Sequence, residues 1–155
     1  MDEPAKTKMP EIVIPTEETS FKEMKGVIGP IVTVIAVALS LFHLYTGGFR
    51  PMPAYEQRGV HLTFVLVLIF LLIPYKKGRK TSWLDILLAV LSAVAGSYLV
   101  IESEGILDRI GVPIARDIIV GGAVLLLVLE ATRRTIGPAV PIVAGIVLLY
   151  TAFGN

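Results

Sequence analysis

Long apolar runs are the feature of this sequence that most restricts how the chain can fold. Five of them follow one another between residues 27 and 153: Val27–Thr46, Val60–Tyr75, Trp83–Ile101, Ile114–Thr132 and Pro138–Phe153. A helix rises about 1.5 Å per residue, so a hydrocarbon core of about 30 Å requires roughly 20 apolar residues. Three runs reach this length, and the two 16-residue runs need flanking residues or a thinner bilayer. The pattern predicts transmembrane helices.

The composition supports this interpretation. Hydrophobic residues make up 54% of the 155 residues and charged residues 17%, against about 25% charged residues in soluble domains. The segment LLAVLSAVAGSYLVI has no polar stripe, and a helix that is apolar on all sides lies either in the core of a large protein or in a membrane. Because this chain is too short to enclose five such helices, we expect an all-α, polytopic transmembrane helical bundle. It would have four spans plus a fifth, C-terminal helix.

The sequence also argues against several classes of function. It has no cysteine, which removes disulfides, Cys-ligated metals and thiol catalysis. Its net charge of +1 gives no reason to expect nucleic-acid binding. The patterns HExxH, GxSxG and GxxxxGKS/T are absent. We therefore predict that the chain is not an enzyme, and that it carries no catalytic residue, cofactor site or metal site.

Basic residues near the ends of the runs predict the orientation, since cytoplasmic loops are enriched in Lys and Arg. Eight such residues lie on one side, namely before the first run, in KKGRK at 76–80 and at Arg133 and Arg134, against four on the other side. The N-terminus is therefore expected in the cytoplasm and the C-terminus on the outer side. Residues 1–26 mix Pro, Lys and Glu without a sustained period, which predicts a largely disordered cytoplasmic segment.

Glu130 lies toward the cytoplasmic end of the fourth run, where the helix dipole disfavours a negative charge. Arg133 and Arg134 follow three and four positions later, so both can reach back to neutralise it. We favour a salt bridge that fixes the end of this helix. The alternative is that Glu130 is a ligand for a coupling ion, because ionisable groups within membranes are often functional.

Trp83 and Asp85 lie at the start of the third run. Trp83 follows the KKGRK loop, where an amphipathic ring belongs at the level of the lipid headgroups. Asp85 falls in the first turn of the expected helix, where a negative charge suits the positive end of the helix dipole. At the other side of the loop, Pro74 is expected to end or kink the second helix.

Small residues spaced four positions apart indicate where helices can pack closely. The third run carries one set at Ala89, Ala93 and Ser97 and another at Ser92 and Gly96, and the fourth run carries Gly121, Gly122 and Ala123. We expect these faces to contact protein.

His43 and His61 lie near the outer ends of the first and second runs. If they share one depth, they face each other across a helical hairpin. We favour two interfacial imidazoles that hydrogen-bond to water or backbone. A proton relay or a metal pair is the alternative, although two histidines without a nearby carboxylate are a weak metal signal.

Three segments together resemble the N-terminal part of fused TRAP transporter permeases, the tripartite ATP-independent periplasmic transporters. They are SLFHLYTGGFRPMPAYEQRGVHL, TSWLDILLAVLS and VLLLVLEATRRTIGPAVPIVAGIVLLYTAFG. The resemblance covers about residues 30–155, in order and with similar spacing. LEATRRTIGPAVPI, from Leu129 to Ile142, is its most specific part, and WLD at 83–85 and HLYT at 43–46 support it.

The resemblance implies a subunit of a secondary transporter in the cell inner membrane, with a periplasmic C-terminus, that takes up organic acids or related solutes. It implies two protein partners besides the lipid bilayer: a large permease subunit, which would bind the coupling sodium ion and the substrate, and a periplasmic solute-binding protein. This chain would brace and dock the large subunit. Residues 27–134 would form the four-span small-subunit module, and residues 135–155 a fifth transmembrane helix that begins the large-subunit region. We expect either that the large subunit is a separate chain or that this chain is a split or truncated product.

Two other classes of function stay open at this point. One is a small self-assembling channel or ion-conducting membrane protein. The other is a membrane enzyme that uses His43 and His61.

Overall fold

The computed structural model describes residues 28–75 and 82–154, and every regular element in these ranges is a helix. The six helices are α1 (Ile28–Gly48), α2 (Ala54–Leu72), α3 (Trp83–Ile101), α4 (Ser103–Asp108), α5 (Ala115–Thr135) and α6 (Ala139–Phe153). The prediction of an all-α chain is therefore confirmed. The predicted N-terminal disordered segment and the basic cluster at 76–80 lie outside the described residues.

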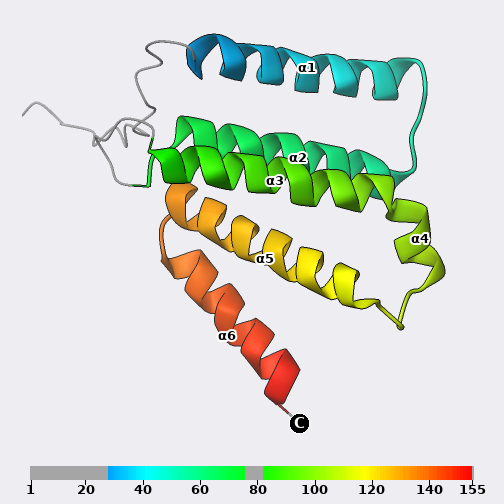
Figure 1. Cartoon of the computed structure of the whole chain (residues 1–155), viewed down its shortest axis with the longest axis vertical. Helices are drawn as coiled ribbons and strands as arrows, with labels where there is room; N and C mark the ends of the chain where they lie inside the picture. Colours follow the sequence, from blue (N-terminus) through cyan, green and yellow to red (C-terminus); the bar gives the residue numbers. More distant parts are fainter. Residues whose placement is uncertain (1–27, 76–81, 155) are drawn as a thin grey trace, which may run out of the picture.

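The long helices run back and forth and form a stack in which α2 and α3 lie side by side at the centre (Figure 1). Helix α1 packs on α2 at one side of this pair, and α5 packs on both α2 and α3 at the other side. Helix α6 contacts α5 near their connection and then diverges from it (Figure 1). One end of the stack, here called the hairpin end, holds the α1–α2 loop and α4. The opposite end, called the cluster end, holds the end of α2 and the start of α3.

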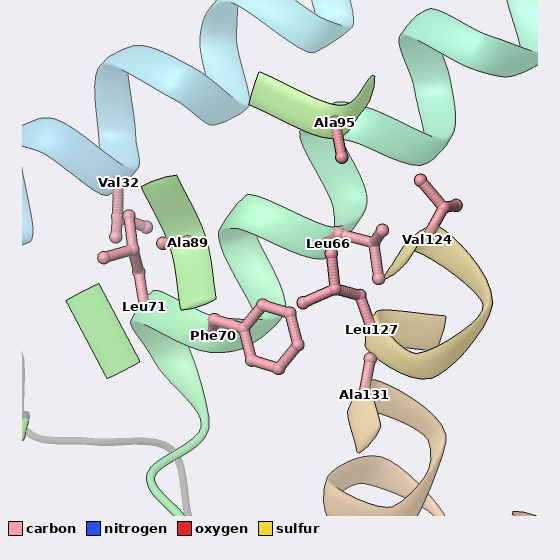
Figure 2. Close-up of a cluster of buried hydrophobic side chains, with 9 residues drawn as sticks. All are labelled: Val32, Leu66, Phe70, Leu71, Ala89, Ala95, Val124, Leu127 and Ala131. Atoms are coloured by element: carbon pink, nitrogen blue, oxygen red, sulfur yellow. The ribbon is translucent and has the colours of Figure 1, made fainter. Parts of the chain in front are cut away.

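The hydrophobic core surrounds α2. Figure 2 shows Phe70 and Leu66 of α2 directed toward α5, where they meet Leu127. On the other side, Leu71 lies next to Val32 of α1. The remaining members of the core are Ala89, Ala95, Val124 and Ala131. The core consists of few large side chains because most apolar residues of this chain point outward, as expected for helices surrounded by lipid.

Helix α3 approaches α2 through small side chains. Its buried residues Asp85, Ala89, Ser92 and Gly96 recur every three or four positions and so occupy one face of the helix. A Cβ atom built on Gly96 would overlap the side chain of Thr63 on α2. The contact predicted for Ser92 and Gly96 is therefore confirmed.

The other small-residue faces were predicted less well. Ser97 is exposed, so the contact predicted for it is not made within the described residues, and the buried face joins Ala89 to Ser92 and Gly96. Gly121 and Gly122 on α5 are also exposed and have open space where a side chain would begin, so the contact predicted for them is not made within the described residues. Spacing alone identifies a face but not the neighbour that it meets.

Proline and glycine set several helix boundaries. Helix α2 begins at Ala54, directly after Pro53, and therefore earlier than the apolar run that predicted it. It ends at Leu72, because Ile73 precedes Pro74 and adopts an extended conformation, as predicted for Pro74. Between α5 and α6, Gly137 has a φ of 104°, a left-handed conformation that favours glycine at the end of a helix. Helix α4 was not predicted and occupies part of the loop between the third and fourth runs.

By length and composition, three described helices could cross a membrane: α1, α2 and α3. Helix α5 is long enough but carries charged residues in both its first and its last turns. Helix α6 is apolar but has only 15 residues. The chain thus has the helices of a membrane protein, whereas its division into four spans plus a fifth remains a prediction.

The contact between Gly96 and Thr63 can be tested by adding one methyl group. We expect Gly96→Ala to lower the free energy of unfolding by about 1–3 kcal/mol, because the new Cβ overpacks the α2–α3 interface. Unfolding in mixed detergent and SDS micelles, followed by circular dichroism, measures this change.

Gly121→Ala is the matched control, since open space surrounds that position. It should leave the stability unchanged or raise it by up to about 1 kcal/mol through helix propensity. Equal destabilisation by the two variants would contradict the close approach of α2 and α3.

Candidate functional site

The most buried polar contact in the described residues joins α3 to α5 at the cluster end. Arg134, in the last turn of α5, donates from Nη1 to Oδ1 of Asp85, in the first turn of α3, over 2.8 Å. The two side chains are 1% and 0% exposed. Because charges lose much hydration when they are buried, such a pair persists only with close geometry and further hydrogen bonds.

Arg134 has those further contacts. Its Nη1 also donates to the carbonyl of Ile73, the residue that follows α2, over 3.1 Å. Its Nε donates to Oε1 of Glu130 over 2.8 Å. Its guanidinium group lies 4.9 Å from the centre of the Phe70 ring, within the range of a cation–π contact. One side chain therefore connects the ends of α2, α3 and α5.

Glu130 and Arg133 form the outer part of this cluster. Arg133 donates two hydrogen bonds to the Glu130 carboxylate, of 2.8 and 2.9 Å, and its guanidinium group lies over the ring of Tyr75. The Glu130 carboxylate thus accepts hydrogen bonds from both arginines, as their spacing of three and four positions predicted. Since Arg133 is 38% exposed, its ion pair lies much closer to the surface than that of Arg134.

Asp85 lies where the sequence predicted it, in the first turn of α3, and its Oδ2 accepts a hydrogen bond of 3.0 Å from the backbone N–H of Ser82. Its partner Arg134 was missed, since 49 positions separate the two residues. One signal was available in the sequence: Asp85 at the start of the third run and Arg134 just after the fourth run lie on the same predicted side of the membrane. Trp83 lies two residues from Asp85 but is 70% exposed, a position compatible with the predicted headgroup anchor.

A second ionic cluster lies at the hairpin end and was not predicted. Asp117, in the first turn of α5, accepts a hydrogen bond of 2.7 Å from the hydroxyl of Tyr98 on α3. Arg109, directly after α4, donates to Asp117 over 2.9 Å and to Glu102 over 2.9 Å. These hydrogen bonds to Asp117 and Glu102 raise the pKa of Arg109 above its usual value. The sequence showed these charges only as members of one loop.

His43 and His61 also lie at the hairpin end, and the structure brings them together. Nε2 of His43 and Nδ1 of His61 are 2.8 Å apart, and the two rings meet edge to face. They thus share one depth and face each other across the hairpin, and they hydrogen-bond to each other, a partner that the favoured interpretation did not include. The next link between the same helices is a hydrogen bond of 3.3 Å from the Gln57 amide to the Thr46 hydroxyl.

The two ionic clusters and the histidine pair define the chemistry that the described residues can perform. Both ionic clusters consist of side chains paired at helix ends, which suits the fastening of helices: two carboxylates meet two arginines at the cluster end, and two carboxylates share Arg109 at the hairpin end. Nowhere in the described ranges do three or more His, Asp or Glu side chains gather as a metal cage. The structure thus places Glu130, Arg133, Arg134 and Asp85 in one cluster, with Trp83 beside it and the histidine pair at the other end.

Comparison with known proteins gives no identification: no family model, curated protein or solved structure matches this chain.

Truncation of the two arginines of the cluster end should lower the free energy of unfolding by very different amounts. We expect Arg134→Ala to lower the free energy of unfolding by about 3 kcal/mol or more, because it removes one partner of a buried ion pair. Arg133→Ala should cost less than about 1 kcal/mol, as is typical of exposed pairs. Unfolding in mixed micelles compares the two variants, and similar losses would contradict the central position of Arg134.

At the hairpin end, Tyr98→Phe removes only the hydroxyl that donates to Asp117. We expect a lower melting temperature, since the carboxylate loses a charge-assisted hydrogen bond. Tyr150→Phe is the control, because Tyr150 is 73% exposed on α6. A melting temperature that falls as far in the control as in Tyr98→Phe would refute a role for this contact in joining α3 to α5.

Proposed function

We propose that this chain is the small-subunit module of a TRAP-type secondary transporter, and that it braces and docks a large permease subunit. The transporter would use an ion gradient to take up organic acids or related solutes. The observation that carries this proposal is that the LEATRRTIGPAVPI segment supplies Glu130, Arg133 and Arg134 of the ion-pair cluster, while the WLD segment supplies Asp85. Arg134 fastens α5 to the end of α2 and the start of α3.

A bracing role agrees with where the polar groups lie. Transport sites are usually built from interrupted helices and polar groups near the middle of the bilayer. In this chain α2, α3 and α5 are continuous, and the ion pairs lie at their ends. Because α3 and α5 are joined at both ends, the unit resists relative movement of these helices. Such a unit supports a moving partner better than it carries a substrate itself.

The proposal includes four spans in the cell inner membrane, with a cytoplasmic N-terminus. Helix α5 would be the fourth span: its charges lie in its first turn and its last two turns, and the stretch 118–129 between them carries no charge. Ion pairing at both ends lowers the cost of placing those charges near the headgroups. Helix α6 would then be the fifth helix, which leads toward the large-subunit region.

Co-purification tests the proposed assembly. The chain carries an affinity tag and is co-expressed with a large TRAP permease subunit encoded in the same genome, and the pair is extracted in mild detergent. We expect the two to purify in equal amounts, while an unrelated multi-pass protein of similar length does not retain the permease. A chain that purifies without the large subunit would contradict the proposal.

Reconstitution separates this function from that of a channel. Liposomes that contain the chain, the large subunit and the solute-binding protein should take up an organic acid when a sodium gradient is imposed, and omission of this chain should abolish uptake. Uptake that persists without the chain would refute the bracing role. Ion conductance by the chain alone would instead favour a self-assembling channel.

A further inference from the structure

The pair of His43 and His61 has a geometry that the proposed bracing role does not use. One ring comes from α1 and the other from α2, and both lie near the hairpin end, about 8–10 Å along their helices from the α1–α2 loop. A nitrogen of each ring faces the other at 2.8 Å. Two imidazoles from different helices that converge on one point form the beginning of a metal-binding site.

We propose that His43 and His61 bind a divalent transition-metal ion, namely Cu²⁺ or Ni²⁺. Imidazole nitrogens suit both ions, and Cu²⁺ forms the strongest complexes of the first-row divalent metals. Without a metal the two ring nitrogens share a hydrogen bond of 2.8 Å, so a small rotation of the rings brings both lone pairs to one ion.

The surroundings of the pair leave room for an ion and further ligands. The two histidines line an open hollow of about 540 Å³, together with Gln57, Arg58 and Leu62. The Gln57 amide nitrogen donates to Thr46, and the amide oxygen of this residue would serve as a third ligand. Water completes the coordination through the open side. No carboxylate lines the hollow, which argues against Ca²⁺ or Mg²⁺.

Among the described residues, Arg58 is the one Lys, Arg, Asp or Glu side chain that lines the hollow. The Arg58 side chain is exposed, long and flexible. Its positive charge lowers the affinity of the site for a cation but does not block the two imidazoles. Its presence makes Arg58→Gln a useful variant, since that change keeps both ligands and removes the repulsion.

Metal binding would have a structural effect. Helix α1 packs on α2, and the histidine pair and the Thr46–Gln57 bond are the polar links between them at this end. An ion held by both imidazoles would replace a weak hydrogen bond with two coordinate bonds and so fasten α1 to the bundle. This inference does not depend on the transporter assignment.

The sequence makes the experiment clean, because it contains only two histidines and no cysteine. The full chain, purified with a tag free of histidine, is titrated with Cu²⁺ and studied by electron spin echo spectroscopy, which detects coordinated imidazole. We expect one copper ion per chain with two imidazole ligands, and a higher melting temperature with copper than without it.

Single variants test the two ligands. His43→Ala and His61→Ala should each weaken copper binding by more than about tenfold, since even the outer partners of metal ligands contribute about that much. Each should also abolish the two-imidazole signature and the rise in melting temperature. Arg58→Gln should keep the signature and bind copper more tightly.

Several results would overturn the proposal. They are a signature of a single imidazole in the unaltered chain, one copper ion shared between two chains, unchanged affinity in the double histidine variant, or loss of binding in Arg58→Gln. Because circular dichroism of each metal-free variant reports its helix content, a loss of binding can be told apart from a loss of fold.

Discussion

The arrangement of the helices depends on one buried charge pair, Arg134 with Asp85. In a region of low dielectric constant an unpaired charge is very costly, so these two helix ends cannot separate or slide without a large penalty. The same guanidinium group also binds the carbonyl of Ile73, which fixes the end of α2. The contact thus specifies which helices are neighbours and at what height they meet, more than it adds net stability.

The rest of the packing follows from that constraint. Arg134 lies over the ring of Phe70, so the charge pair is continuous with the hydrophobic core around α2. Figure 2 shows Phe70 within that core. Between the two ends, α3 presents small residues, which allow Gly96 to approach Thr63 closely. At the hairpin end Tyr98 and Asp117 join α3 to α5 a second time. Helices α3 and α5 are thus fixed to each other at both ends and α3 packs closely on α2 in between, whereas α1 and α6 lie at the sides with fewer restraints (Figure 1).

The positions of the ionisable groups are informative about function. Glu130, which the sequence offered as an alternative ligand for a coupling ion, is paired with Arg133 and Arg134 at the end of α5. The histidine pair is different, since its nitrogens face each other beside an open hollow and neither ionic cluster involves it. A rigid centre with a separately fastened α1 fits the proposed brace, and the proposed metal site lies where that fastening occurs.

The sequence by itself determined the helical class, the apolar character of the long helices, the end of α2 before Pro74 and the pairing of Glu130 with Arg133 and Arg134. All of these depend on local chemistry, because helix spacing places positions three and four apart on one face. Only the tertiary structure decided that Arg134 meets Asp85, that Tyr98 meets Asp117, and that Gly96 rather than Gly121 lies against a neighbour. Those contacts depend on the rotation and relative height of whole helices, which no spacing along the chain records.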